Sequence, residues 1–300
     1  METWVLLAIM AAAFQTLRFM LQKQLSMGTL SAGGATLARF FYAAPFVVLG
    51  TGFYVWAIGA APRGFTLAFW SYALSGGLAQ ILATWCVVAL FAQRNFAVGI
   101  TFKKTEVVQT ALVGLILLGD RVSTGGLMAI LIGLVGVLVL SNGPGGLRGG
   151  GRGLFNASAG LGLTSGAFFA LSAVCYRAAT LEIESEDALV RAGITLSVVT
   201  TAQTLGLVAW LGWREKGQVA RVWAARRTAV WMGLTGMGGS LGWFTAFTLQ
   251  NAAYVFAVGQ VEVIFSILAS VLFFRERISG REFLGIALVT ASILALVALA

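Results

Sequence analysis

The feature that most constrains this chain is an apolar segment of membrane-spanning length that occurs twice. Residues 97–123 read AVGITFKKTEVVQTALVGLILLGDRVS, and residues 253–279 read AYVFAVGQVEVIFSILASVLFFRERIS. A shift of 156 residues aligns the two without a gap and places Glu106 on Glu262. Two copies of one apolar segment, each interrupted by a carboxylate and each ending in an acidic-basic pair, indicate a duplicated membrane protein.

The composition supports the membrane class. Of the 300 residues, 59% are hydrophobic and only 10% are charged, whereas a soluble domain carries roughly 25% charged residues. A helix that crosses the bilayer core needs about 20 apolar residues. The apolar runs predict ten such helices: 3–21, 32–58, 66–92, 97–119 and 124–141, then 154–177, 187–211, 228–249, 253–274 and 280–299.

The ten spans divide into two sets of five. We expect a first five-helix repeat over residues 1–141, a glycine-rich linker over 142–153, and a second repeat over 154–300. Five crossings leave the second repeat inverted relative to the first, an architecture that puts the substrate site near the midplane, between the halves. The predicted fold is therefore an all-α integral membrane protein, with ten transmembrane helices as two inverted five-helix repeats around a central cavity.

The net charge of +9 does not predict nucleic-acid binding here, because the basic residues sit mainly in short loops, where they orient membrane proteins and contact anionic lipids. The chain has no histidine, and its two cysteines stand alone in apolar segments. These features predict no metal site, no cofactor and no disulfide framework. No catalytic constellation is present, so we expect a protein that is not an enzyme.

Loop charges predict how the chain is oriented. The face with both termini carries three basic residues, Arg63, Arg121 and Arg177. The opposite face carries twelve: Lys23, Arg94, Arg148, Arg152, Arg214, Lys216, Arg221, Arg226, Arg227, Arg275, Arg277 and Arg281. Because basic loops stay in the cytoplasm, this count places both termini outside.

Charged residues inside the spans are the leading candidates for substrate binding or coupling, because a charge at the bilayer centre costs at least ~2.5 kcal/mol. Glu106 shares one helix face with Lys103, while Lys104 points away. Glu262 has no basic neighbour in its own helix, and Gln260 stands where the first copy has Lys104. In one interpretation, the carboxylates bind a proton or a substrate amine, and the lysines bind a substrate carboxylate or phosphate. The other makes Lys103 and Glu106 a structural pair, with both lysines extending to the interface.

Further candidates are less specific. Arg39 lies about two turns inside the second span, where it could bind an anion. Trp85, Trp243 and Tyr254 could line an apolar cavity, although aromatic residues in membrane helices also form interfacial belts. We expect Arg18 and Arg177 to be anchors at helix ends.

The acidic-basic motifs at the ends of the two apolar segments resemble a motif of a known family. GDRVS (119–123) and RERIS (275–279) resemble the Gly-Glu-Arg-Leu-Ser turn between the fourth and fifth helices of EamA-type domains, in the drug/metabolite transporter superfamily. Asp120 and Arg275 depart from that pattern. The resemblance implies a basket of helices around a central cavity, alternating access, and a homodimer contact at the fifth and tenth helices. The resemblance also implies that both termini are cytoplasmic, whereas the loop-charge count places them outside.

The function that follows is secondary active transport of a small zwitterionic or anionic organic metabolite, with amino acids as the first expectation. The expected setting is a bacterial inner membrane, with a proton or counter-solute as coupling partner. Two alternatives stay open: a membrane-embedded protein that handles lipid, as flippase or enzyme, and a passive channel or assembly subunit.

Overall fold

The computed structural model describes residues 2–26, 28, 30–91, 102–141, 157–265 and 280–299, and within these ranges the regular structure is helical apart from one isolated β-bridge. The helices of the first half are α1 (Thr3–Ser26), α2 (Ala32–Ala57), α3 (Leu67–Phe91), α5 (Glu106–Leu118) and α6 (Thr124–Ser141). Those of the second half are α7 (Ala157–Glu182), α8 (Ala188–Arg214), α9 (Gln218–Ala224), α10 (Arg226–Leu249), α11 (Ala252–Gly259) and α13 (Gly280–Leu299).

Length and apolar composition confirm the all-α membrane class. Among the described residues, α1, α2, α3, α7 and α8 each contain a stretch long and apolar enough to cross a membrane. Shorter apolar helices lie over Glu106–Leu118, Thr124–Leu140, Ala252–Phe265 and Phe283–Leu299. Helix thus covers most of the described part of each predicted span, with turns inside the fourth and the ninth. Residues 92, 97–101, 154–156 and 266–274 of these spans, the predicted linker at 142–153 and the turn motif at 275–279 lie outside the described residues.

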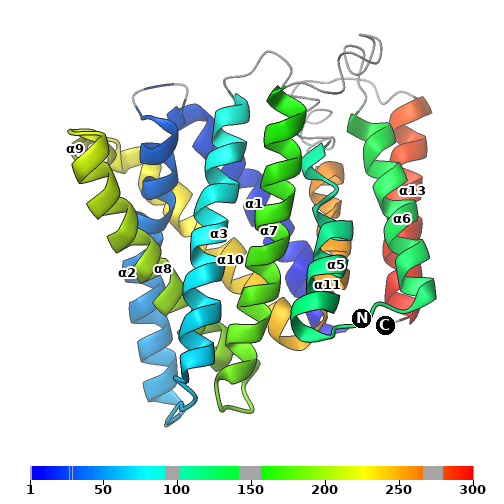
Figure 1. Ribbon diagram of the computed structural model, residues 1–300, viewed down its shortest axis with the longest axis horizontal. Coiled ribbons are helices and arrows are strands. Elements are labelled where there is room, and N and C mark those ends of the chain that lie inside the picture. The colour runs from blue at the N-terminus through cyan, green and yellow to red at the C-terminus, as the bar shows by residue number, and fades with distance from the viewer. Residues whose placement is uncertain are drawn as a thin grey trace.

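The two halves pack against each other helix by helix (Figure 1). In the first half, α1 packs on α10 and α3 packs on α7, while α2 pairs with α8 and α6 pairs with α13. Exchanging the halves converts α1·α10 into α7·α3 and leaves the other two pairs unchanged. This is the pairing pattern that a pseudo-two-fold axis between inverted repeats produces.

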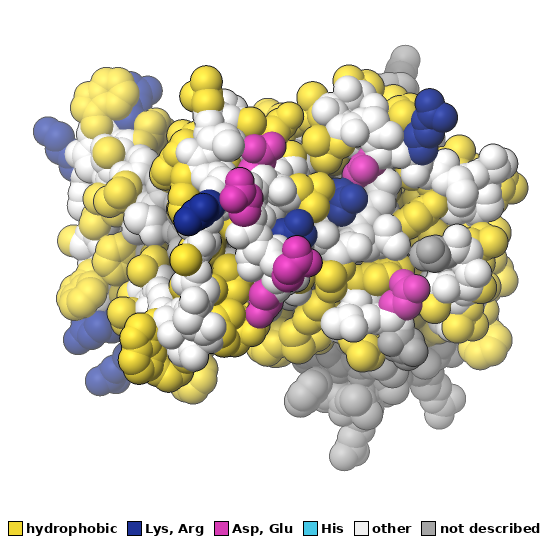
Figure 2. Space-filling view, turned by 90° about the horizontal axis from the view of Figure 1, so that it is seen from below, with side chains coloured by type: hydrophobic (Ala, Val, Ile, Leu, Met, Phe, Trp, Pro, Cys, Tyr) yellow, Lys and Arg dark blue, Asp and Glu magenta, His cyan; other side chains and the backbone are white. Residues whose placement is uncertain are grey.

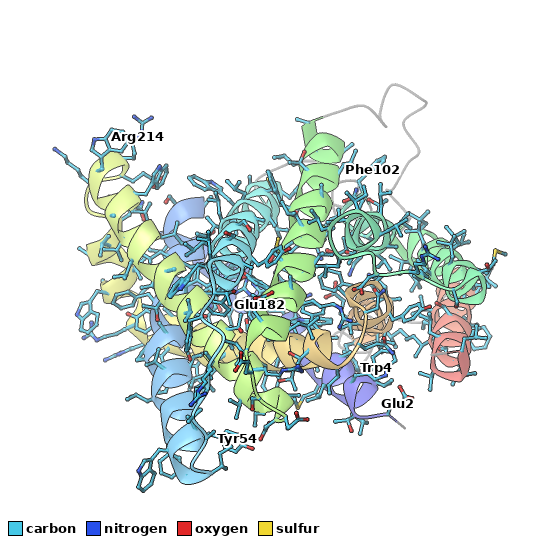
Figure 3. The ribbon with its side chains drawn as sticks, turned by 60° about the horizontal axis from the view of Figure 1, so that its bottom comes forward. Glu2, Trp4, Tyr54, Phe102, Glu182 and Arg214 are labelled. Carbon is cyan, nitrogen blue, oxygen red and sulfur yellow. The ribbon has the colours of Figure 1, made fainter. Side chains whose placement is uncertain are left out.

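The faces of the bundle differ in charge. Both ends of the chain lie at its lower edge in Figure 1, and Figure 2 shows acidic side chains gathered on that lower face. In Figure 3, Tyr54 and Glu182 lie at the lower ends of α2 and α7, far from Arg214 at the upper end of α8. Acidic loop residues therefore share the face of the termini.

Local chemistry fixes where several helices begin and end. Ser31 accepts from the backbone N–H of Gly34 at the start of α2, and Asp187 accepts from Leu189 and Val190 at the start of α8. After α5, Gly119 adopts φ of +69°, the left-handed conformation in which glycine ends a helix without strain. The short helix α9 lies in what the sequence predicts as a loop.

Candidate functional site

The fourth and ninth predicted spans are both interrupted, at equivalent positions. The chain is helical at 102–103, turns at Lys104 and Thr105, and continues as α5 from Glu106. In the second half, α11 ends at Gly259, Gln260 forms a turn, and residues 261–265 are helical again. The 156-residue shift places Lys104 on Gln260. Discontinuous helices at matching points of two repeats are typical of substrate and ion sites in transporters.

At these interruptions an ion pair connects the two halves. Lys104 Nζ of the first half contacts Glu262 Oε1 of the second. The other carboxylate oxygen of Glu262 accepts a hydrogen bond from Gln15 Nε2 at 2.7 Å. Gln15 in turn accepts from the indole Nε1 of Trp243 at 3.2 Å. Glu262, which has no basic neighbour in its own helix, therefore obtains its cation from the opposite repeat.

The first-half carboxylate is paired within its own segment. Lys103 Nζ lies 2.9 Å from Glu106 Oε1, and both side chains are almost fully buried. The ammonium group also lies 4.9 Å from the ring centroid of Phe169, a distance at which cation–π attraction acts. This geometry fits the structural-pair interpretation of Lys103 and Glu106, but with the lysines buried in the protein rather than extended to the interface.

A small cavity lies beside this contact, between helices of both halves. Its polar lining consists of Gln15, Arg39, Gln80, Ser172, Tyr176 and Ser240. Its apolar lining consists of Phe169, Ala173, Trp243, Phe244, Phe247 and Phe256. The volume of this cavity is about 30 Å³. One water molecule needs roughly 10–15 Å³ of such volume. In this conformation the cavity has room for about two or three waters, so binding of a metabolite requires the surrounding helices to move apart.

Arg39 lies in the wall of this cavity, as its depth in the sequence predicts. Its guanidinium donates to Thr84 Oγ1 at 3.2 Å and to Ser240 Oγ at 3.4 Å. Arg18, expected as a helix-end anchor, is instead 98% buried and donates to Gln22 at 2.9 Å. The prediction for Arg18 is wrong because α1 extends to Ser26, which places Arg18 well inside the helix.

The remaining candidates lie at separate places. Gln260 is buried at the second interruption, where its amide donates to Phe256 O at 3.4 Å. Trp85 packs edge-to-face on Trp210, with ring centroids 4.8 Å apart. Tyr254 accepts from the Ser123 backbone N–H at 3.0 Å, at the turn before α6. Of the three aromatic candidates, Trp243 is the one that lines the cavity and also donates a hydrogen bond to Gln15, the residue that binds Glu262.

Two neutral polar residues of the site, Gln15 and Gln80, were not among the candidates predicted from the sequence. Gln15 lies on α1, and Gln80 on α3 accepts hydrogen bonds from Tyr176 Oη at 3.1 Å and from Gln203 Nε2 at 3.0 Å. A side-chain amide at bilayer depth needs a hydrogen-bond partner inside the protein. Isolated glutamines within apolar runs are therefore the sequence signal that could have identified these two residues.

Arg177 connects the two halves at the lower face. Its Nε donates to Asp120 of the GDRVS turn at 2.8 Å, and its Nη1 donates to the carbonyls of Phe247 and Gln250 at 2.7 and 2.9 Å. Rather than an interface anchor, Arg177 is a cap on the end of α10. The acidic residue of the turn motif thus has a structural role.

Comparisons with known proteins agree with this architecture. Residues 157–298 match the model of the EamA-like transporter family. A solved crystal structure, titled "Crystal structure of protein", superposes with a TM-score of 0.72 at 15% identity, covering 100% of this chain and 97% of that one. At this identity the likeness shows the fold alone. No curated protein matches the sequence.

Proposed function

We propose that this chain is a secondary active transporter of the drug/metabolite type, because residues 157–298 match the model of the EamA-like transporter family. Its proposed solute is a small zwitterionic or anionic organic metabolite, with amino acids first to be tested. Alternating access of one site to the two faces of a bacterial inner membrane is the proposed mechanism.

The observation that carries the proposal is the Lys104–Glu262 pair. It joins the halves at the two repeat-related helix interruptions. Gln15 links the pair to the cavity, because it lines the cavity and also binds Glu262. A contact between two inverted repeats, adjacent to a polar cavity, is where alternating access brings substrate and protein together.

The chemistry of this pair suggests how binding couples to movement. Separating the halves would leave a buried ammonium and a buried carboxylate without each other, which is strongly unfavourable unless new partners replace them. A proton or a substrate amine would neutralise Glu262, and a substrate carboxylate would neutralise Lys104. A solute carrying these groups therefore binds the open state better than the closed one, as any ligand that shifts a conformational equilibrium must.

Reconstituted protein tests the proposal directly. Uptake into proteoliposomes would be screened across amino acids, organic acids and sugar phosphates, with Glu262→Gln and Lys104→Ala beside the parent. We expect one solute class to be carried, and each variant to lose at least about tenfold in uptake, since charged hydrogen bonds contribute about 1.5–3 kcal/mol.

Two matched variants separate the site from general charge effects. Glu106→Gln changes the repeat mate of Glu262, and Glu186→Gln changes an exposed loop carboxylate. We expect the loop variant to transport like the parent and Glu106→Gln to act mainly on stability. Equal uptake by the parent, Glu262→Gln and Lys104→Ala would remove the ion pair from the site.

The charge asymmetry supports a second proposal, that both termini lie outside the cytoplasm. In a variant with Cys86 and Cys175 replaced by serine, single cysteines would be introduced at the exposed positions Glu186 and Lys216. We expect a membrane-impermeant maleimide added to intact cells to label Glu186→Cys and to spare Lys216→Cys. The reverse labelling would show that the termini are cytoplasmic.

A further inference from the structure

The described interior of the protein holds more positive than negative charge. Arg18, Arg39, Lys103 and Lys104 are each at least 96% buried. The two carboxylates of the predicted fourth and ninth spans, Glu106 and Glu262, are engaged by the two lysines. Within the described residues, neither Arg18 nor Arg39 makes an ion pair. Among the residues that the structure describes, these two buried guanidinium groups therefore have no carboxylate counter-charge.

The two arginines are neighbours. A methyl group placed on Gly236 of α10 would lie 3.4 Å from Arg18 Cδ and 3.5 Å from Arg39 Cγ. The absence of a side chain at Gly236 thus lets α1 and α2 bring their arginines together against α10. Two like charges held close together in a medium of low dielectric repel each other, and this arrangement needs a compensating anion.

Some of the N–H donors around this arginine pair have no acceptor among the described residues. Arg39 uses its terminal nitrogens on the neutral hydroxyls of Thr84 and Ser240. Arg18 Nη2 and Gln22 Nε2 are buried without a partner among the described residues. Both are donors, so the group that would satisfy them is an acceptor. Guanidinium groups recognise carboxylate and phosphate oxygens through paired N–H donors.

We propose that Arg18 and Arg39, with Gln22, form an anion-binding site next to the cavity, and that the transported solute carries a carboxylate or phosphate group that occupies it. This inference rests on the proposed function. Because the arginine pair adds two positive charges that the described carboxylates do not balance, it narrows the solute from zwitterionic or anionic to one with net negative charge. Arg39 already lines the cavity, and Arg18 supplies the second positive charge beside it.

Binding to purified protein in a neutral detergent tests the site without transport. Inorganic phosphate and succinate are the anionic probes, and leucine is the probe without net charge, each measured by calorimetry and by the shift in melting temperature. We expect the parent to be stabilised by the anions more than by leucine. Arg18→Gln and Arg39→Gln should each bind the anions at least about tenfold more weakly.

Arg191 provides the control, because it occupies the position in α8 that corresponds to Arg39 in α2. Its Nε donates to Ile183 O at 3.2 Å, outside the arginine pair, and we expect Arg191→Gln to bind anions like the parent. Arg39→Lys, which keeps the charge and loses the planar fork, should bind with intermediate affinity. Because Arg18→Gln removes an uncompensated buried charge, we expect it to fold at least as stably as the parent without anion, so lost binding would not reflect unfolding.

Several results would overturn the inference. Equal anion binding by parent, Arg18→Gln and Arg39→Gln would show that the anion sits elsewhere. Stabilisation by phosphatidylglycerol, with none by phosphate or succinate, would make the site a lipid contact. Transport of an uncharged or cationic solute without anion binding would refute this inference and leave the transporter intact, whereas anion binding without any transport would refute the transporter and leave the site.

Discussion

Single side chains in this protein act mostly by joining elements that are distant in the sequence. Asp187 is the clearest case outside the membrane interior: one carboxylate oxygen caps α8, and the other accepts from Tyr54 Oη of α2 at 2.7 Å. The Tyr54 hydrogen bond, followed by the two backbone donors, holds the pKa of Asp187 below its usual value. The ionised form is thus the one that the folded protein stabilises.

This geometry predicts a pH-dependent contribution to stability. Asp187→Ala should destabilise the protein by about 1 kcal/mol, the typical cost of losing an N-cap. Because the pKa in the folded state is depressed, the contribution of the charge is complete above the unfolded-state pKa of about 3.9 and disappears as the pH falls through the folded-state value. Thermal unfolding in detergent from pH 7 to pH 3 would measure it.

Two controls make this prediction specific. Asp187→Asn keeps a capping oxygen without the charge, so its melting temperature should exceed that of Asp187→Ala and depend less on pH than that of the parent. Glu186→Ala alters the exposed neighbour and should leave stability unchanged. A melting temperature for Asp187→Ala equal to that of the parent at pH 7 would refute the capping role.

At the scale of elements, the helices were largely predictable and their interruptions were not. Hydropathy predicts spans because every backbone group in a membrane must be satisfied within a helix, and the 156-residue repeat supplies the division into halves. Hydropathy did not separate the turns at Lys104 and Gln260 from the spans around them, because each span as a whole stays apolar despite the polar residues at these positions. The repeat did identify the positions that matter there, Glu106 and Glu262.

What the sequence could not supply was the choice of partners between elements. Helix periodicity pairs Lys103 with Glu106 correctly, because both lie in one segment. The pairing of Lys104 with Glu262 depends on how the two halves meet, 158 residues apart in the chain. The same limit explains Arg18, which becomes Arg39's neighbour through the packing of α1 and α2 on α10.

At the scale of the whole molecule, the two halves are interleaved, with α1 against α10 and α3 against α7. Their shared interior contains the ion pair, the arginine pair and a cavity too small for a metabolite. Transport of a metabolite through this interior therefore requires a second arrangement of the halves in which the cavity opens. A carrier must pass through both arrangements for each solute moved, whereas a passive channel need not.

Counterflow measures that difference most directly. Proteoliposomes preloaded with the solute identified by the uptake screen would be diluted into a trace of the labelled solute, with parent, Glu262→Gln and empty vesicles compared. We predict saturable uptake by the parent that preloading accelerates and transiently drives above equilibrium, and its loss in Glu262→Gln. Uptake that neither saturates nor responds to preloading would contradict alternating access and indicate a channel.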